Sequence, residues 1–267
     1  MKRYALLGKK LSHSYSKLVH EYIFQKFSWD ASYSFWELEE KDIEKAIPLA
    51  KEKKLDGFNI TVPYKECLLS QIDSIDEAAR RIGAINTIVK ENNKMIGYNT
   101  DCFGFQKMLE YFAIDVDTKK IVILGTGGAS KAVAEALRLL GAASIQFVSR
   151  SPAGTQLSYG EYLEGDILIN TTPVGMYPDK SGSPISKEVF SHFSTAIDLI
   201  YNPKETQFLS DAKSFGLFSI NGLFMLVAQA IRSEEIWFHK RFDISLYHEV
   251  YSYLEGIIYE NYGNSRS

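Results

Sequence analysis

The chain has 267 residues, of which 45% are hydrophobic, and a formal net charge of -3 at pH 7. This length allows a large core, and we expect two domains of ordinary size. Lysines and arginines are scattered among the acids without a basic stripe, so we expect a small-molecule substrate and no nucleic acid partner. Residues 1–30 lack a signal-peptide pattern, and no window approaches the roughly 18 apolar residues of a membrane span. We therefore expect a cytoplasmic protein with no membrane partner.

The spacing of cysteines and histidines gives no indication of a metal site. Cys67 and Cys102 lie in no C-x-x-C motif, and the five histidines show no helix-pair ligand spacing. A disulfide scaffold and a bound metal are therefore not expected.

The N-terminal part of the chain alternates predicted strands and helices, which is typical of parallel strands joined by crossovers. The predicted elements are strand 3–7, a helix from about residue 16, strand 33–38, helix 41–53 and strand 57–61. Ser14 and Ser16 fall at the first helix start, where serines commonly act as N-caps. Alternatively, their two hydroxyls hold a ligand carboxylate.

Lys65 has an unusual predicted position. Pro63 fits the first turn of a helix after strand 57–61, which puts Lys65 near the N-terminus of that helix. The helix dipole and the unpaired amides disfavour a cation there, so proton exchange near neutral pH would be easier. The alternative is an exposed lysine that points to solvent.

A predicted hairpin precedes another candidate residue. After a helix over 77–82, strands 84–89 and 94–98 are joined by Glu91-Asn92-Asn93. Asp101 then stands at the start of a helix, where a negative charge is favourable. Stabilisation of that helix start is its simplest role.

The segment 120–130 predicts a strand, a tight turn and a helix. An apolar run ends at Gly125-Thr126-Gly127-Gly128, and a helical apolar stripe begins at Ala129. Such a run is typical of a parallel strand buried on both faces, and the glycines let the backbone approach a bulky ligand. The amides at the helix N-terminus can bind a pyrophosphate, although the glycine spacing departs from the plain dinucleotide fingerprint. A purely structural turn is the alternative.

The residues after the next strand, 144–148, indicate which nucleotide is bound. This strand ends in Ser149-Arg150-Ser151, with no acid before Glu161. An acid here would bind the ribose of NAD, whereas an arginine accommodates the 2′-phosphate of NADP. Arg150 therefore favours NADP.

The remaining predicted elements are strands 166–170 and 196–200 and helices 223–238 and 247–259. Residues 150–166 lack the pattern of a crossover helix.

An ordered set of motifs between residues 8 and 229 resembles the shikimate dehydrogenase family. The motifs are Gly8-x-x-Leu-Ser-His-Ser14-x-Ser16, Phe58-Asn59-Ile60-Thr61-Val62-Pro63-Tyr64-Lys65, Gly83-Ala84-Ile85-Asn86-Thr87, Asn99-Thr100-Asp101, Gly125-Thr126-Gly127-Gly128-Ala129-Ser130, Asn170-Thr171-Thr172-Pro173-Val174-Gly175-Met176 and Asn221-Gly222-x-x-Met225-Leu226-Val227-x-Gln229.

This resemblance implies an α/β fold with a mainly parallel sheet in an N-terminal substrate domain and a Rossmann-type NADP-binding domain. We expect the substrate-binding catalytic domain over 1–100 and the Rossmann domain over 101–236, with the C-terminal helix 237–267 packing back on the first. The implied activity is that of an NADP-dependent oxidoreductase acting on a CH–OH group. It would reversibly reduce 3-dehydroshikimate to shikimate in chorismate and aromatic amino acid biosynthesis. Whether it is a monomer or a homodimer stays open.

The resemblance also implies roles for individual residues. Lys65 and Asp101 would bracket the reacting hydroxyl, with Lys65 as the proton donor. The implied substrate-binding residues are Ser14, Ser16, Thr61, Asn86, Tyr201 and Gln229, with the two serines on the carboxylate. The implied cofactor-binding residues are Gly125, Gly127, Gly128, Ala129, Ser149, Arg150, Leu199, Gly222 and Glu77.

The chain departs from the family pattern at some positions. Lys17 stands where the family often has proline, and Asn221 stands where it commonly has an acid. Pro152-Ala153-Gly154-Thr155 supplies no second basic residue within a few positions of Arg150, so we expect a weaker grip on NADP with NADPH still preferred over NADH. One alternative is a quinate/shikimate dehydrogenase that uses NAD, against which Arg150 argues. Another is a catalytically silent dinucleotide-binding sensor, which a replaced Lys65 or Asp101 would favour.

Overall fold

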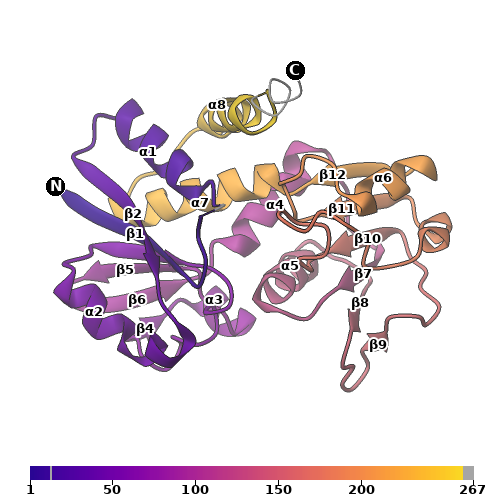
Figure 1. Cartoon of the computed structure of the whole chain (residues 1–267), viewed down its shortest axis with the longest axis horizontal. Helices are drawn as coiled ribbons and strands as arrows, with labels where there is room; N and C mark the ends of the chain where they lie inside the picture. The colour runs from indigo at the N-terminus through magenta and orange to yellow at the C-terminus, as the bar shows by residue number, and fades with distance from the viewer. Residues whose placement is uncertain (13, 261–267) are drawn as a thin grey trace. The chain divides into compact units, whose positions relative to one another are not determined.

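The computed structural model describes residues 1–12 and 14–260, which form two compact units (Figure 1). Unit 1 comprises Met1–Gly104 and Leu226–Leu254, and unit 2 comprises Phe105–Met225 and the residues from Glu255. Within the described residues each unit is built on a six-stranded sheet, which confirms the predicted α/β class. His13 of the first motif and the end of the predicted segment 237–267 lie outside the described residues.

The two units differ from the predicted domain ranges near the C-terminus. Residues 226–236, predicted in the second domain, belong to unit 1. Residues from Glu255 onward, predicted with the first domain, belong to unit 2. The helix that carries Gln229 is therefore shared between the units, and Gln229 itself lies in unit 1.

The sheet of unit 1 is mixed but mainly parallel. Its strands are β1 (Lys2–Gly8), β2 (Ala31–Glu37), β3 (Gly57–Ile60), β4 (Ser74–Ile75), β5 (Thr87–Glu91) and β6 (Lys94–Tyr98), in the order β2-β1-β3-β5-β6-β4. β1 pairs in parallel with β2 and β3, and β4 pairs in parallel with β6. β5 is antiparallel to β3 and to β6, so the predicted hairpin forms the antiparallel part of the sheet.

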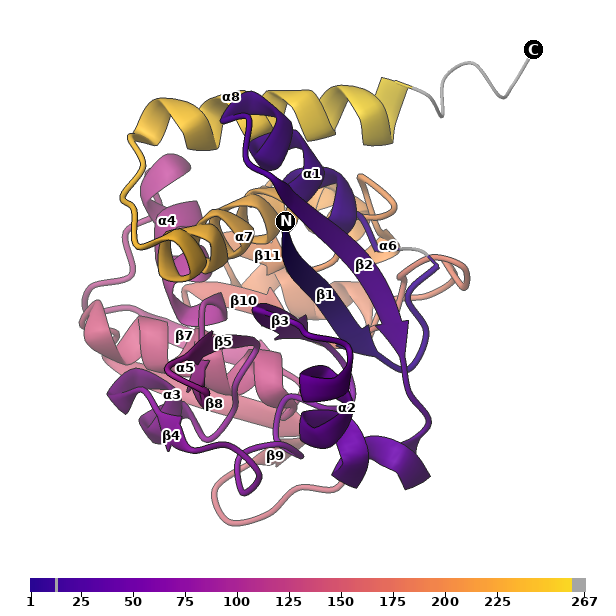
Figure 2. The ribbon, with the colours of Figure 1, turned by 90° about the vertical axis from the view of Figure 1, so that its left-hand side faces the viewer.

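Helices cover both faces of this sheet. The helical elements of unit 1 are α1 (Ser16–Lys26), the 3-10 turn η1 (Glu40–Lys45), α2 (Ala46–Glu52), α3 (Glu77–Ile82), most of α7 (Leu223–Phe238) and α8 (Ile244–Glu255). Leu6 of β1 belongs to a buried cluster with Phe24 of α1 and Trp237 of α7. The next residue, Leu7, belongs to a cluster with Ala50 of α2. Since side chains alternate across a strand, α1 and α7 cover one face and α2 the other (Figure 2).

Unit 2 has the parallel sheet and the strand–turn–helix that the sequence predicts. Its strands are β7 (Lys120–Leu124), β8 (Ser144–Ser149), β9 (Leu157–Ser158), β10 (Ile167–Asn170), β11 (Thr195–Asp198) and β12 (Phe218–Asn221), in the order β12-β11-β10-β7-β8-β9. Its helical elements are most of α4 (Asp101–Tyr111), α5 (Gly128–Leu139), η2 (Lys187–His192), α6 (Gln207–Ser214) and the π-helical turn η3 (Gly256–Glu260). Every strand pair is parallel. Among the described residues no helix lies between β8 and β10, as predicted.

One predicted element near the candidate site is wrong. Residues 62–71 form a series of turns and not a helix after β3. The Tyr64 backbone N–H donates to the Thr61 carbonyl, and the Cys67 backbone N–H donates to the Tyr64 carbonyl. Each bond joins residues three positions apart, as in a turn, and not four apart, as in an α-helix. Lys65 therefore does not lie at a helix N-terminus, and the predicted dipole effect on it has no helix as its source.

Within the described residues, no helix is both long enough and apolar enough to cross a membrane.

Candidate active site

Lys65 and Asp101 form a largely buried ion pair in unit 1. Lys65 Nζ lies 2.7 Å from Asp101 Oδ2, and the side chains are 16% and 7% exposed. The Ile85 backbone N–H donates to the Lys65 carbonyl at 2.8 Å, which ties the Lys65 turn to the segment before β5. An ammonium and a carboxylate held together in this way can exchange a proton with a ligand and keep their geometry.

The helix start at Asp101 is capped by another residue. The Asn99 side-chain oxygen accepts hydrogen bonds from the backbone N–H groups of Asp101 and Cys102, at 3.1 and 3.2 Å. The Asp101 carboxylate is therefore not needed as a cap and is available for side-chain contacts. Its position at the first residue of α4 still suits a negative charge.

Asn86 binds the other oxygen of Asp101. Its amide nitrogen donates to Asp101 Oδ1 at 2.8 Å, and its amide oxygen accepts from the Thr100 backbone N–H at 2.7 Å. A carboxylate oxygen only accepts and a backbone N–H only donates, so the orientation of this amide is fixed. Asn86 is buried, and it holds the Asp101 carboxylate in place from the side opposite Lys65.

Gln229 of α7 lies beside Asn86. Its side-chain oxygen is 3.4 Å from Asn86 Nδ2 and from Thr100 Oγ1, and its amide nitrogen donates to the Leu226 carbonyl at 2.9 Å. The structure thus brings together four of the predicted residues, Lys65, Asp101, Asn86 and Gln229. It adds Thr100, whose hydroxyl and backbone both contact Asn86.

The predicted carboxylate-binding serines lie next to each other. The Ser14 hydroxyl is 3.2 Å from the Ser16 hydroxyl and accepts from the Ser16 backbone N–H at 3.3 Å. Tyr15 occupies the N-cap position of α1 without a side-chain capping bond, and Ser14 accepts the first N–H of the helix from the position before it. Thr61, partly exposed, follows β3 and donates its backbone N–H to the Leu7 carbonyl at 2.9 Å.

Gly125 and Gly127 in the glycine turn of unit 2 differ in whether the local structure requires glycine. Gly125 has a φ of 105°, and a Cβ there would lie 2.8 Å from Thr171 Oγ1. Gly127 is the N-cap of α5 and makes no side-chain capping bond, and a Cβ on it would meet nothing within 4 Å. The first-turn amides that follow, at Gly128 and Ala129, are thus left for a ligand. A phosphate group fits this open helix start.

Arg150 and Ser149 end the next strand of the same sheet. Ser149 is buried and its hydroxyl accepts from the Ser151 backbone N–H at 3.2 Å, whereas Arg150 is exposed. The nearest following acid, Glu161, accepts two hydrogen bonds from Ser158, at 2.6 and 2.7 Å. That acid is already used within its own loop, so the end of β8 offers a cation and hydroxyls, as a 2′-phosphate requires.

Gly222 and Leu199, which follow β12 and β11, approach each other closely. A Cβ on Gly222 would lie 2.1 Å from the Leu199 carbonyl oxygen, which requires glycine at this position on structural grounds. The neighbouring Asn221 donates its amide to the Lys204 carbonyl at 2.9 Å and to the Tyr259 hydroxyl at 3.1 Å. An aspartate could not donate to a carbonyl, and this gives a physical reason for the asparagine.

Two predicted site residues belong to a different unit from most of the residues predicted to share their ligand. Glu77, predicted to contact the cofactor, is the first residue of α3 in unit 1. Its side chain is 88% exposed and pairs with Arg81 at 2.8 Å. Tyr201, predicted to contact the substrate, lies in unit 2, where its carbonyl accepts from the Tyr259 hydroxyl at 2.8 Å.

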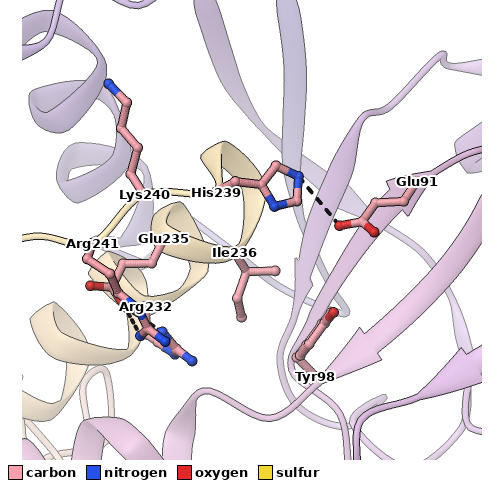
Figure 3. A pocket seen from close by; sticks show the side chains of 8 residues that line it. All are labelled: Glu91, Tyr98, Arg232, Glu235, Ile236, His239, Lys240 and Arg241. Atoms are coloured by element: carbon pink, nitrogen blue, oxygen red, sulfur yellow. Dashed lines mark hydrogen bonds and ion pairs between the residues drawn. The ribbon is translucent and has the colours of Figure 1, made fainter.

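A cavity of about 260 Å³ lies elsewhere in unit 1, near the end of α7 (Figure 3). Its lining residues are Glu91, Tyr98, Arg232, Glu235, Ile236, His239, Lys240 and Arg241. Glu235 binds Arg232 and Arg241 at 2.6 and 3.1 Å, and Glu91 lies 3.6 Å from His239. The Arg241–Glu235 pair joins the segment after α7 to that helix, and the His239–Glu91 pair joins it to β5, so these charges stabilise the fold.

Comparison with known proteins shows the family of this chain. The shikimate dehydrogenase (NADP(+)) of Clostridium beijerinckii is 40% identical over 266 residues, which cover 96% of this chain and 98% of that protein. The chain belongs to the shikimate dehydrogenase family. A model of the shikimate dehydrogenase substrate binding domain matches residues 6–88, which lie within unit 1.

Solved shikimate dehydrogenases have the same fold. Shikimate dehydrogenase 1 from Peptoclostridium difficile is 42% identical, with a TM-score of 0.92 that covers 97% of this chain and 100% of that one. The shikimate 5-dehydrogenase of Thermus thermophilus, solved in complex with NADP(H) and shikimate, is 31% identical, with a TM-score of 0.84 over 94% of this chain and 99% of that one.

Proposed function

We propose that this chain catalyses the reversible, NADPH-dependent reduction of 3-dehydroshikimate to shikimate. The observation that carries the proposal is the buried pair of Lys65 and Asp101, which Asn86 and Gln229 adjoin in a chain of this family. This pair is present where a catalytically silent sensor would have lost it. The Thermus thermophilus relative, solved with NADP(H) and shikimate bound, supports the same choice of ligands.

Lys65 acts as the proton donor. Reduction of a carbonyl group leaves negative charge on its oxygen, which needs a proton from a group within hydrogen-bond reach. One N–H of the Lys65 ammonium binds Asp101 Oδ2 at 2.7 Å, and an ammonium has two further donors for a ligand. Asp101, fixed by Asn86, keeps the ammonium oriented. In the reverse direction Lys65 takes the proton from the shikimate hydroxyl.

The substrate is held through its carboxylate and its hydroxyls. The adjacent hydroxyls of Ser14 and Ser16 bind the carboxylate, since both can donate to one anionic group. Thr61, Asn86, Tyr201 and Gln229 supply the remaining polar contacts of the substrate. A ring that carries several hydroxyls requires such a mixture of donors and acceptors.

The cofactor is NADP, held by unit 2. Gly125, Gly127, Gly128 and Ala129 form the open helix start that suits the pyrophosphate, and Arg150 with Ser149 suits the 2′-phosphate. Leu199 and Gly222 form a further wall of this site, and Glu77 is a candidate contact from unit 1. Bound NADPH supplies the hydride that reduces the carbonyl carbon.

The two ranges of the chain have separate tasks in this proposal. Residues 1–100 bind the substrate and carry Lys65, and the C-terminal helix 237–267 belongs with the substrate domain. Residues 101–236 bind NADP and add Asp101, Tyr201 and Gln229 to the substrate site. The active form is a monomer or a homodimer, which sedimentation analysis would distinguish.

A spectrophotometric assay tests the proposed function. The purified chain is mixed with NADP⁺ and either shikimate or quinate, and again with NAD⁺ in place of NADP⁺. We expect NADPH formation to be fastest with shikimate and NADP⁺. Faster oxidation of quinate with NAD⁺ would support the quinate/shikimate dehydrogenase alternative, and no turnover with any pair would support the silent sensor.

A further inference from the structure

Two consecutive polar residues of α7, Ser233 and Glu234, are completely buried in unit 1. They lie one helical turn after Gln229, and Gln229 and Ser233 share a face of the helix because they are four residues apart. Neither residue belongs to the predicted site. Each contacts a different element that carries predicted substrate residues.

Glu234 binds His20 of α1. Glu234 Oε1 makes a hydrogen bond with His20 Nδ1, and the His20 ring stacks on Tyr33 with centroids 4.1 Å apart. His20 lies four residues after Ser16, so this contact joins the helix of the proposed carboxylate-binding serines to the helix of Gln229.

Burial favours the neutral forms of both Glu234 and His20. Burial lowers the pKa of His20 to about 3 and raises the pKa of Glu234 well above its ordinary value. Glu234 Oε2 has no hydrogen-bond partner among the described residues. Two apolar side chains would avoid this cost of burial, so stability alone does not explain the pair.

Ser233 binds β3 and the first residue of β5, which directly follows Asn86. Its hydroxyl lies 2.9 Å from Thr87 Oγ1 and accepts from Asn59 Nδ2 at 2.9 Å. Thr87 in turn donates to the side-chain oxygen of Asn86 at 3.1 Å. The Asn59 side-chain oxygen accepts from the Tyr33 hydroxyl at 2.8 Å, so this buried chain of hydrogen bonds ends at the ring that stacks on His20.

We propose that Ser233 and Glu234 are positioning residues, which fix α7 so that Gln229 keeps its place relative to Ser14 and Ser16 on one side and to Asn86 on the other. Packing of apolar side chains holds a helix against a sheet but tolerates small sliding and rotation. Two directional, buried hydrogen bonds to different elements allow neither sliding nor rotation of the helix. This inference rests on the proposed function, because Gln229 and the serines are substrate-binding residues only there.

The test compares variants that differ in a single hydrogen bond. Glu234→Met removes the bond to His20 at similar volume, whereas Glu234→Gln keeps a donor for His20 Nδ1. Ser233→Ala removes the hydroxyl on the other side. Ser214→Ala is the matched control. The Ser233 hydroxyl donates to the Gln229 carbonyl of its own helix at 3.0 Å, and the Ser214 hydroxyl donates in the same way to the Asp211 carbonyl, far from the proposed ligand residues in sequence.

For each variant we would measure KM for shikimate, KM for NADP⁺, kcat and the thermal unfolding temperature. We expect Glu234→Met and Ser233→Ala to raise KM for shikimate about tenfold. KM for NADP⁺ should stay within about twofold, since the proposed NADP⁺ residues other than Glu77 belong to unit 2, whereas this helix turn belongs to unit 1. Glu234→Gln should restore KM for shikimate to near the wild-type value, and Ser214→Ala should leave it unchanged.

The proposal is overturned if Glu234→Met and Ser233→Ala both fold and keep the wild-type KM for shikimate. It is also overturned if both variants lower the unfolding temperature and change the two KM values in parallel, because that pattern shows a purely structural role. A wild-type chain without activity on shikimate would instead contradict the proposed function.

Discussion

The Lys65 ammonium donates a hydrogen bond of 2.7 Å to Asp101 Oδ2, although the two residues are 36 positions apart in the sequence. Lys65 stands in a turn after β3 and Asp101 at the start of α4. Both positions are fixed by backbone hydrogen bonds and by Asn99 and Asn86, and not by the ion pair itself. A ligand can therefore share the ammonium without loss of the local structure.

Asp101→Asn should separate orientation from proton transfer. Both partners of the Asp101 carboxylate are donors, Lys65 Nζ and Asn86 Nδ2, so an amide nitrogen at this position loses one of them. We expect kcat for shikimate oxidation to fall about a hundredfold or more. Stopped-flow or steady-state kinetics measure this, with Asp179→Asn on an exposed loop as the control. Unchanged kcat in Asp101→Asn would contradict the orienting role.

Arg150→Gln tests the choice of nucleotide. An exposed guanidinium that contacts the 2′-phosphate should matter for NADPH and not for NADH, which lacks that phosphate. We expect kcat/KM for NADPH to fall about tenfold or more and kcat/KM for NADH to change little. Arg138→Gln, at an exposed arginine of α5 in the same unit, is the matched control. Equal losses for NADPH and NADH would rule out the 2′-phosphate contact.

Much of the architecture follows from local patterns. The run from Lys120 to Leu124 and the glycine turn are strong patterns, and they formed β7 and α5 as predicted. The two-residue strands β4 and β9 are too short for any periodicity, and half-exposed β12 has little apolar alternation. These elements depend on their neighbours in the sheet, which local sequence does not contain.

Local sequence likewise predicts only part of the candidate site. The ordered motifs predicted Lys65, Asp101, Asn86 and Gln229, but local reasoning placed Lys65 on a helix that is not there. Pro63 fits a helical first turn as well as it fits a non-helical one, so the local pattern did not decide. Ser233 and Glu234 look like ordinary polar residues of an amphipathic helix, and only tertiary packing shows that they are buried. The link between α1 and α7 spans 214 positions and leaves no local pattern.

Gly127→Ala and Gly222→Ala form a matched pair in unit 2. A Cβ at position 127 meets nothing within 4 Å, whereas a Cβ at position 222 would lie 2.1 Å from the Leu199 carbonyl oxygen. Gly127→Ala should therefore fold with a near-normal melting temperature but weaken NADPH binding, because its methyl group takes space at the open helix start. Gly222→Ala should lower the melting temperature. Fluorescence titration with NADPH and calorimetry measure both, and equal stability losses would contradict this distinction.

Asp198→Asn should change how stability depends on pH. Burial raises the pKa of Asp198 to about 7 from an ordinary value near 3.8, although hydrogen bonds from Thr206, Ile200 and Asn170 oppose this increase. Between these values the folded chain holds a proton that the unfolded chain releases. The free energy of unfolding therefore falls as pH rises from about 4 to about 7, by at most about 1.4 kcal/mol per pH unit.

An asparagine at position 198 cannot ionise, so the variant should lack this part of the pH dependence. Chemical denaturation of both proteins between pH 4 and pH 8 gives the comparison. We expect the stability of Asp198→Asn relative to the wild type to increase with pH, since only the wild type loses stability through this group. Parallel curves would show that Asp198 titrates alike in the folded and unfolded chains.

The most direct test of the proposed chemistry is Lys65→Ala, measured by NADPH formation from shikimate and by NADPH binding in the same preparation. Without the ammonium no group is held by Asp101 to exchange a proton with the substrate oxygen, so kcat should fall by about two to four orders of magnitude. The dissociation constant for NADPH should stay near the wild-type value, because the proposed NADP residues lie in unit 2, with Glu77 the one candidate from unit 1. Near-normal turnover in Lys65→Ala would contradict the account.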